Sequence, residues 1–149
     1  MPRMAQIIPL PRPAALPSAT TLPLLLATVP AGFPSPAADY EEGRLDLTEL
    51  LIRHPAATFL MRVKGESMRD AGILDGDLLI VDRSIPPVHG HIVVAGIDGD
   101  LTVKRLRRQG RRAWLVAANP DFPPIEITDR EDAVIFGVAA HAVHHLLKG

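Results

Sequence analysis

The sequence predicts a mainly β domain that curls on itself, with one short helix and a flexible N-terminal arm. Apolar residues make up 47% of the 149 residues and aromatic residues only 4%, so the core must consist mainly of Val, Ile, Leu and Ala, which suits strands. Short apolar segments alternate closely with turn residues from Thr58 onward, as expected for a curled sheet. A chain of this length has room for one domain and an arm.

Residues 1–38 are predicted to form the arm. They contain nine of the fifteen prolines, almost no charge and no sustained period of 2 or 3.6, as in an extended, mobile chain. Arg3 and Arg12 precede an apolar run, which is also the pattern of a secretory signal. Prolines interrupt that run before it reaches the ~20 apolar residues of a spanning helix, so we favour an arm, with no membrane contact. The lack of cysteine fits a cytoplasmic location.

The domain, residues 39–149, is expected to begin with a helix in the stretch "RLDLTELLIRHP". Asp46 can cap this helix, Glu49 stands in the matching capping-box position, and Pro55 ends it. An apolar stripe lies along one side, formed by Leu47, Leu50 and Leu51.

Seven strands are predicted after the helix, from segments with strand-forming composition. Asp75-Gly76-Asp77 precedes one strand, Asp98-Gly99-Asp100 joins two strands as a hairpin, and Gln109-Gly110 joins the next pair, because such dipeptides favour tight turns. The predicted strands are residues 59–63, 77–82, 91–97, 101–106, 113–118, 125–127 and 133–143.

Ser67 is a candidate nucleophile in the loop "KGESMRDAGILDGD", but an isolated hydroxyl needs a base within hydrogen-bond reach. No histidine lies in a setting that suggests a triad. Lys104, in the strand "LTVKRL", could serve as the base only if burial lowered its pKa. Period-2 alternation puts Lys104 and Arg105 on opposite, equally apolar faces, so the residues alone leave open which of them points inward. A loop serine and a solvated lysine remain the plainer interpretation.

Longer blocks of the sequence resemble a known family. "GESM", "GILDGDLLIVD" and "GDLTVKRL" are similar to the Gly-x-Ser-Met, Asp-Gly-Asp and Thr-Val-Lys blocks of the LexA/UmuD family of self-cleaving serine peptidases, peptidase family S24. The resemblance runs from Gly32 to the C-terminus and is closest to the UmuD branch, through "GFPSPAADY", "DLTELLIRHP", "HGHIVVA" and "IFGV". No helix-turn-helix precedes these blocks, so we expect no direct sequence-specific DNA binding.

The resemblance implies specific roles for five residues. Ser67 is expected to be the nucleophile and Lys104 the general base, a Ser-Lys variant of triad chemistry. The scissile bond is expected between Ala31 and Gly32, and the backbone N–H groups of Glu66 and Ser67 are the expected oxyanion donors. UmuD proteins commonly carry Cys-Gly at this bond and LexA carries Ala-Gly, so the chain departs from UmuD there. Its arm is also longer and richer in proline.

The same resemblance implies a regulated switch in SOS mutagenesis. A RecA filament on single-stranded DNA is expected to stimulate self-cleavage, after which a homodimer of residues 32–149 joins a UmuC-type subunit as the translesion DNA polymerase V. No cofactor and no metal are expected. Three alternatives stay open: a regulatory subunit that binds a polymerase or filament without cleaving itself, a LexA-like self-cleaving regulator, and a signal-peptidase-like enzyme acting in trans. Burial of Lys104 beside Ser67 would favour the cleaving alternatives.

Two further segments carry suggestive side chains. "HAVHH" contains His141, His144 and His145, which could hold a metal on a helix, although we expect exposed tail histidines. "KRLRRQGRR", residues 104–112, could contact a phosphate backbone, but a solvated hairpin is the expected structure. Trp114 is expected to anchor its strand in the core.

Overall fold

The computed structural model describes residues 7–9, 20–25 and 41–147, so the Ala31–Gly32 bond lies outside the described residues. Strands dominate the described part, as predicted. The elements are β1 (Ile7–Pro9), β2 (Thr21–Leu25), β3 (Glu41–Asp46), α1 (Leu47–Leu51), the 3₁₀ turn η1 (Pro55–Ala57), β4 (Thr58–Arg62), the 3₁₀ turn η2 (Arg69–Ala71), β5 (Leu78–Asp82), β6 (Ile92–Ile97), β7 (Asp100–Gln109), β8 (Arg112–Val116), β9 (Ile125–Glu126) and β10 (Ala133–Val143).

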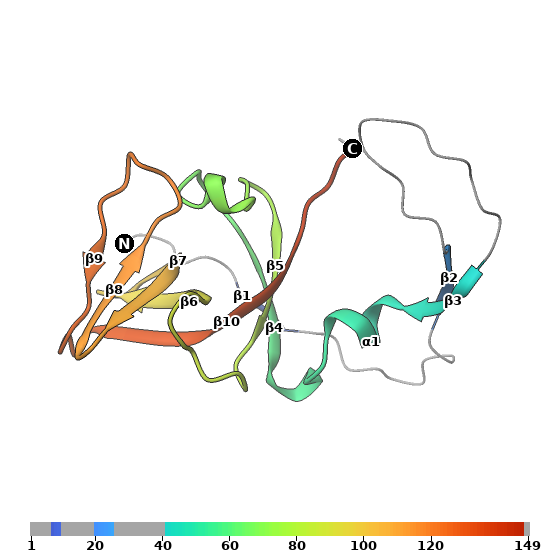
Figure 1. Ribbon diagram of the computed structural model, residues 1–149, viewed down its shortest axis with the longest axis horizontal. Coiled ribbons are helices and arrows are strands. Elements are labelled where there is room, and N and C mark those ends of the chain that lie inside the picture. Colours follow the sequence, from blue (N-terminus) through green and yellow to red (C-terminus); the bar gives the residue numbers. More distant parts are fainter. Residues whose placement is uncertain (1–6, 10–19, 26–40, 148–149) are drawn as a thin grey trace. The chain divides into compact units, whose positions relative to one another are not determined.

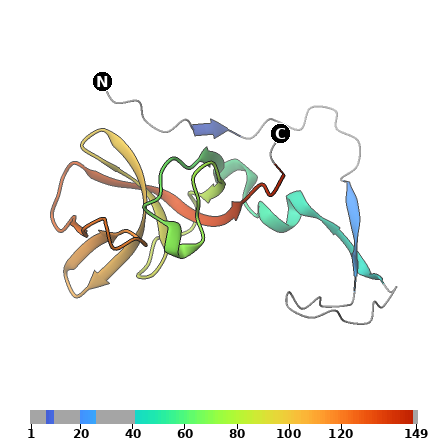
Figure 2. The same ribbon diagram turned by 90° about the horizontal axis from the view of Figure 1, so that it is seen from above.

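The seven predicted strands are present as β4 to β10 and belong to one antiparallel sheet with the order β1-β4-β5-β10-β6-β7-β8-β9. The long strand β10 pairs with β6 along its first half and with β5 along its second half. In Figures 1 and 2 it runs between the β6–β9 group and the β4–β5 pair. One strand therefore belongs to both halves of the sheet, and the predicted mainly β, curled architecture is confirmed.

The strand β10 is irregular where it changes partner, with register shifts after Ile135 and after Ala139. Gly137 lies between these shifts, and a Cβ placed there would come within 2.7 Å of Val81 Cγ1. The missing side chain therefore allows β10 to approach β5 closely.

Substitution of Gly137 by alanine is expected to lower the free energy of unfolding by about 1–3 kcal/mol, because the added methyl group overpacks the contact with Val81. Gly43→Ala is the matched control, since a Cβ at Gly43 meets nothing within 4 Å, and its effect should stay within about 0.5 kcal/mol. Urea denaturation of both variants measures the difference. Equal stability of the two variants would contradict the packing argument.

The turn between β6 and β7 has the two-residue form predicted from its sequence. Asp98 and Gly99 both have positive φ, 55° and 87°, which is the backbone of a type I′ hairpin. This two-residue turn sets the register of β6 and β7, in which Lys104 lies opposite Val93.

The helix α1 begins as predicted, because the Asp46 carboxylate accepts hydrogen bonds from the backbone N–H groups of Thr48 at 2.9 Å and Glu49 at 3.4 Å. The helix is a single turn, and the predicted stripe is not buried: Leu47 is 51% exposed and Leu50 47% exposed. Pro55 starts a separate 3₁₀ turn, η1.

Two stretches of the expected arm are strands. The strand β1 pairs with β4, and β2 pairs with β3. The chain divides into two compact units: one contains β2, β3 and α1, and the other contains β1 and the remaining elements. The division of the chain at residue 38 stays a prediction.

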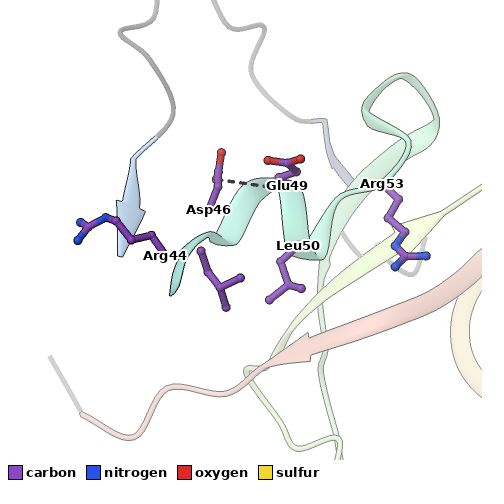
Figure 3. Close-up of a pocket in the computed structure, with 6 residues that line it drawn as sticks. Arg44, Asp46, Glu49, Leu50 and Arg53 are labelled. Carbon is purple, nitrogen blue, oxygen red and sulfur yellow. Dashed lines mark hydrogen bonds between the residues drawn. The ribbon is translucent and has the colours of Figure 1, made fainter. Parts of the chain in front are cut away.

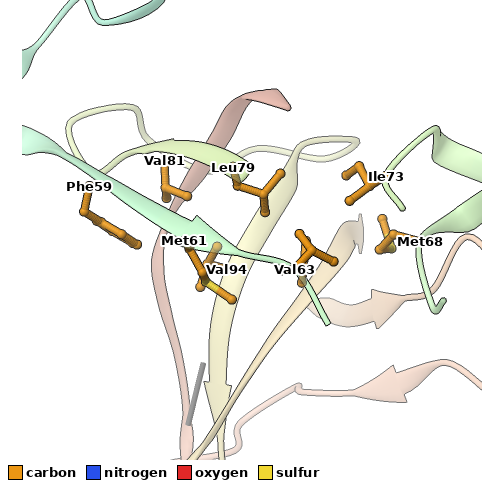
Figure 4. Close-up of a cluster of buried hydrophobic side chains, with 9 residues drawn as sticks. Phe59, Met61, Val63, Met68, Ile73, Leu79, Val81 and Val94 are labelled. Carbon is orange, nitrogen blue, oxygen red and sulfur yellow. The ribbon is translucent and has the colours of Figure 1, made fainter. Parts of the chain in front are cut away.

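Buried apolar side chains form two clusters within the sheet unit. Figure 4 shows the larger cluster, in which strand residues pack with Met68 and Ile73 from the loop between β4 and β5. Trp114 is buried, as predicted. The larger cluster contains Phe59, Met61, Val63, Met68, Ile73, Leu79, Val81, Val94 and Val103, and the smaller contains Val93, Ala95, Leu106, Leu115 and Val138.

Candidate active site

Lys104 points into the protein from the middle of β7. The lysine is 7% exposed, whereas its neighbour Arg105 is exposed and donates to the carbonyl of Gly90 at 2.8 Å. Leu106, two residues further along the same face as Lys104, is fully buried. The structure therefore answers the question that strand alternation left open, and Lys104 is the inward residue.

Ser67 lies in the loop between β4 and η2 and is partly buried. Two contacts hold the loop on either side of it. Before the serine, the N–H of Gly65, at φ 93°, donates to the Asp75 carboxylate at 2.7 Å. After it, Met68 is 1% exposed within the larger core cluster. A glycine with positive φ and a buried methionine thus fix the serine between them.

The two candidate residues lie side by side. Lys104 Nζ is 3.0 Å from Ser67 Oγ, 2.7 Å from Thr102 Oγ1 and 3.1 Å from the carbonyl oxygen of Val103. A neutral amine has two N–H donors and one lone pair. It can donate to Thr102 and Val103 while its lone pair accepts the Ser67 hydroxyl proton, so the geometry suits a base that activates a serine.

Burial lowers the pKa of Lys104 from its ordinary value. The cause is desolvation of the ammonium group, and the three hydrogen-bond partners of Nζ are all uncharged oxygens. Burial of an ammonium group without a neighbouring negative charge destabilises its charged form, so the lysine becomes neutral more easily. The environment therefore shifts Lys104 toward the protonation state that a general base requires.

A cavity of about 300 Å³ opens beside Lys104. Its wall is largely apolar and comes from β6, β7, β9 and the loop that follows β8. An apolar wall of this kind suits small or apolar side chains. Its lining residues are Ile97, Asp100, Thr102, Lys104, Phe122, Pro123 and Ile125.

Asn119 is a residue of this region that the sequence did not single out. It is 6% exposed, and its Nδ2 donates to the carbonyl oxygen of Glu66 at 2.9 Å. Asn119 differs from an ordinary loop asparagine in this hydrogen bond, which reaches a segment 53 residues earlier in the chain. The local sequence around Asn119 gives no sign of so distant a contact.

The histidines of "HAVHH" do not share a helix, because β10 continues to Val143. His144 Nδ1 instead lies 2.6 Å from the buried carboxylate of Asp77. Within residues 7–9, 20–25 and 41–147, no group of three His, Cys, Asp or Glu side chains is arranged to hold a metal ion.

The basic segment forms the hairpin of β7 and β8. Arg107 and Arg112 lie over the Trp114 ring, with their guanidinium carbons 4.3 Å and 4.6 Å from its centroid. Arg112 also makes a bidentate ion pair with the Glu126 carboxylate. These contacts explain how Trp114 is covered while the arginines stay exposed.

A second cavity, of about 370 Å³, belongs to the unit that contains β3 and α1. Figure 3 shows acidic and basic side chains around it, with Asp46 accepting a hydrogen bond from the backbone of Glu49 at the start of α1. None of the candidate catalytic residues lines it. The lining residues are Arg44, Leu45, Asp46, Glu49, Leu50 and Arg53.

Comparison with known proteins gives a match to the family described as Peptidase S24-like over residues 23–140. The chain is 49% identical over 122 residues to the protein ImpA of Salmonella typhimurium, covering 82% of this chain and 83% of that protein. It is 46% identical over 132 residues to the protein SamA of Salmonella typhimurium, covering 89% and 91%. It is 46% identical over 117 residues to the LexA repressor of Acidithiobacillus ferrooxidans, covering 77% of this chain and 56% of the repressor.

Proposed function

Because the chain belongs to the Peptidase S24-like family, we propose that it cleaves its own arm, with Ser67 as the nucleophile and Lys104 as the general base. The observation that carries the proposal is the 3.0 Å separation of Lys104 Nζ and Ser67 Oγ, at a lysine that is 7% exposed. The same burial favours a cleaving protein over a regulatory subunit that never cuts, since a buried lysine beside a serine has no evident use in a purely binding role.

The first step of the proposed reaction forms an ester. As Ser67 Oγ attacks the carbonyl carbon of Ala31, the neutral amine of Lys104 takes the hydroxyl proton. The resulting ammonium group then gives a proton to the nitrogen of Gly32 as the peptide bond breaks. Water hydrolyses the ester in a second step, with Lys104 again accepting and returning a proton. Thr102 and the carbonyl of Val103 hold Nζ during both transfers.

The backbone N–H groups of Glu66 and Ser67 are the proposed donors to the oxyanion that forms on the scissile carbonyl. The scissile bond itself, Ala31–Gly32, lies outside the described residues. A small side chain followed by glycine suits a narrow approach to Ser67. The apolar cavity beside Lys104 is where we place the flanking arm segment.

The chain is a UmuD-like protein of SOS mutagenesis, as its similarity to ImpA and SamA supports. We propose that a RecA filament on single-stranded DNA stimulates the cleavage in the cytoplasm, and that the trimmed homodimer, residues 32–149, joins a UmuC-type polymerase subunit. No helix in the described residues is long and apolar enough to cross a membrane.

Self-cleavage of the purified full-length chain is expected to accelerate with rising pH. The rate follows the neutral fraction of Lys104, which grows about tenfold for each pH unit below its pKa. Because burial places that pKa below the ordinary 10.5, the rate should level off below pH 10.5. First-order rate constants from gel densitometry across the alkaline range measure this profile, with Ser67→Ala as the background. A wild-type rate that is flat with pH would contradict Lys104 as the base.

A further inference from the structure

The direction of the Ser67 N–H is set by the carbonyl group of Glu66. The structure contains no cis peptide bond among its described residues, and in a trans peptide the C=O and N–H groups point in opposite directions. A group that holds the Glu66 carbonyl oxygen on one side therefore directs the Ser67 N–H to the other side. In the described part of the chain, that N–H makes no hydrogen bond, so it is free to meet a substrate oxygen.

Asn119 holds this carbonyl. Its Nδ2 donates to Glu66 O at 2.9 Å, whereas the other donor, the N–H of Arg69, is further away at 3.2 Å and belongs to the same short turn. A second bond joins the two segments, from the N–H of Asp70 to the carbonyl of Ala118 at 2.8 Å. The bond from Asn119 therefore anchors the serine loop to the segment that follows β8, whereas the bond from Arg69 stays within the serine loop.

The other side of the Asn119 amide stabilises the cavity wall. Asn119 Oδ1 accepts from the N–H of Asp121 at 3.0 Å, and the Asn119 carbonyl accepts from the N–H of Phe122 at 3.1 Å. Phe122 and Pro123 line the cavity beside Lys104. One buried side chain thus touches both the peptide that carries the serine and the loop that carries the wall.

We propose that Asn119 is a positioning residue for the cleavage. It orients the Glu66–Ser67 peptide so that the Ser67 N–H faces the developing oxyanion. It also holds that peptide at a fixed position relative to the cavity. This inference rests on the proposed function. Asn119 touches neither the Ser67 hydroxyl nor Lys104 Nζ in the hydrogen-bond network, so its role is separate from that of the base.

The test compares self-cleavage by the full-length chain and its Asn119→Ala variant across the alkaline range. The variant should cleave about 10- to 100-fold more slowly at every pH, because the oxyanion donor is misplaced. The midpoint of its pH profile should equal that of wild type, because Asn119 is not a hydrogen-bond partner of Lys104 Nζ and the backbone bond from the Phe122 N–H to the carbonyl of residue 119 is kept. Asn119→Asp is the second variant. It keeps the size and the acceptor for Asp121 but lacks the donor to Glu66, and it should also be slow.

Thr58→Val is the matched control, since Thr58 is buried and its hydroxyl also donates to a backbone carbonyl, that of His54, at 2.7 Å. It should lose similar stability in thermal unfolding and cleave at the wild-type rate. Folded Asn119 variants that cleave within twofold of wild type would overturn the inference, as would a shifted pH midpoint at an unchanged maximal rate. Failure of the wild type itself to cleave would instead contradict the proposed function.

Discussion

Replacement of Ser67 by alanine is expected to lower the rate of self-cleavage by about 10⁴-fold or more, because no activated nucleophile remains and only the oxyanion donors act on water. The fold should be unaffected. The Ser67 hydroxyl contacts Lys104 Nζ, which keeps its bonds to Thr102 and Val103. Cleavage is followed by gel densitometry, and thermal unfolding checks the fold.

Ser84→Ala is the control for this substitution. The Ser84 hydroxyl bonds the Asp82 carboxylate at 2.6 Å and has no contact with Lys104, so this variant should cleave at the wild-type rate. Normal amounts of product from Ser67→Ala, or a loss of cleavage shared by Ser84→Ala, would contradict the assignment of Ser67.

Replacement of Lys104 by arginine is expected to slow cleavage strongly at every pH. The guanidinium group stays protonated throughout the accessible range, so raising the pH cannot supply a base, and the loss should again reach about 10³- to 10⁴-fold. Lys64→Arg, at an exposed lysine, should cleave normally. Recovery of Lys104→Arg at alkaline pH would exclude Lys104 as the base.

Lys104→Met separates catalysis from folding. The folded-state pKa of Lys104 lies below its ordinary value, so the charged form is disfavoured in the fold. The wild type should therefore gain stability as the pH rises from below that lowered pKa toward 10.5. The uncharged Lys104→Met variant should lack this pH dependence, fold normally and remain inactive, which urea denaturation at several pH values can establish.

Turn residues and strand composition predicted most of the sheet. The Asp98-Gly99 pair is an example, since a two-residue turn with positive φ at both positions leaves few alternatives to a hairpin. Three strands, β1, β2 and β3, were not predicted, and two of them contain a proline, Pro9 in β1 and Pro23 in β2. A strand with proline is tolerated at a sheet edge, and both lie at an edge.

The candidate site was predictable only in part. Resemblance to the S24 family pointed to Ser67 and Lys104, whereas alternation could not tell whether Lys104 or Arg105 faces inward. Packing decides this, since Lys104 shares its face with the buried Leu106. Asn119 was missed because its importance comes from one hydrogen bond to Glu66, far away in the chain, and a single asparagine in a loop has no distinguishing pattern.

The most direct test of the central claim is the intact mass of the purified chain after incubation at alkaline pH and, separately, with nucleotide-loaded RecA filament on single-stranded DNA. The wild type is expected to give a new species that begins at Gly32, and Ser67→Ala should give none. An unchanged wild-type mass under both conditions would contradict self-cleavage between Ala31 and Gly32.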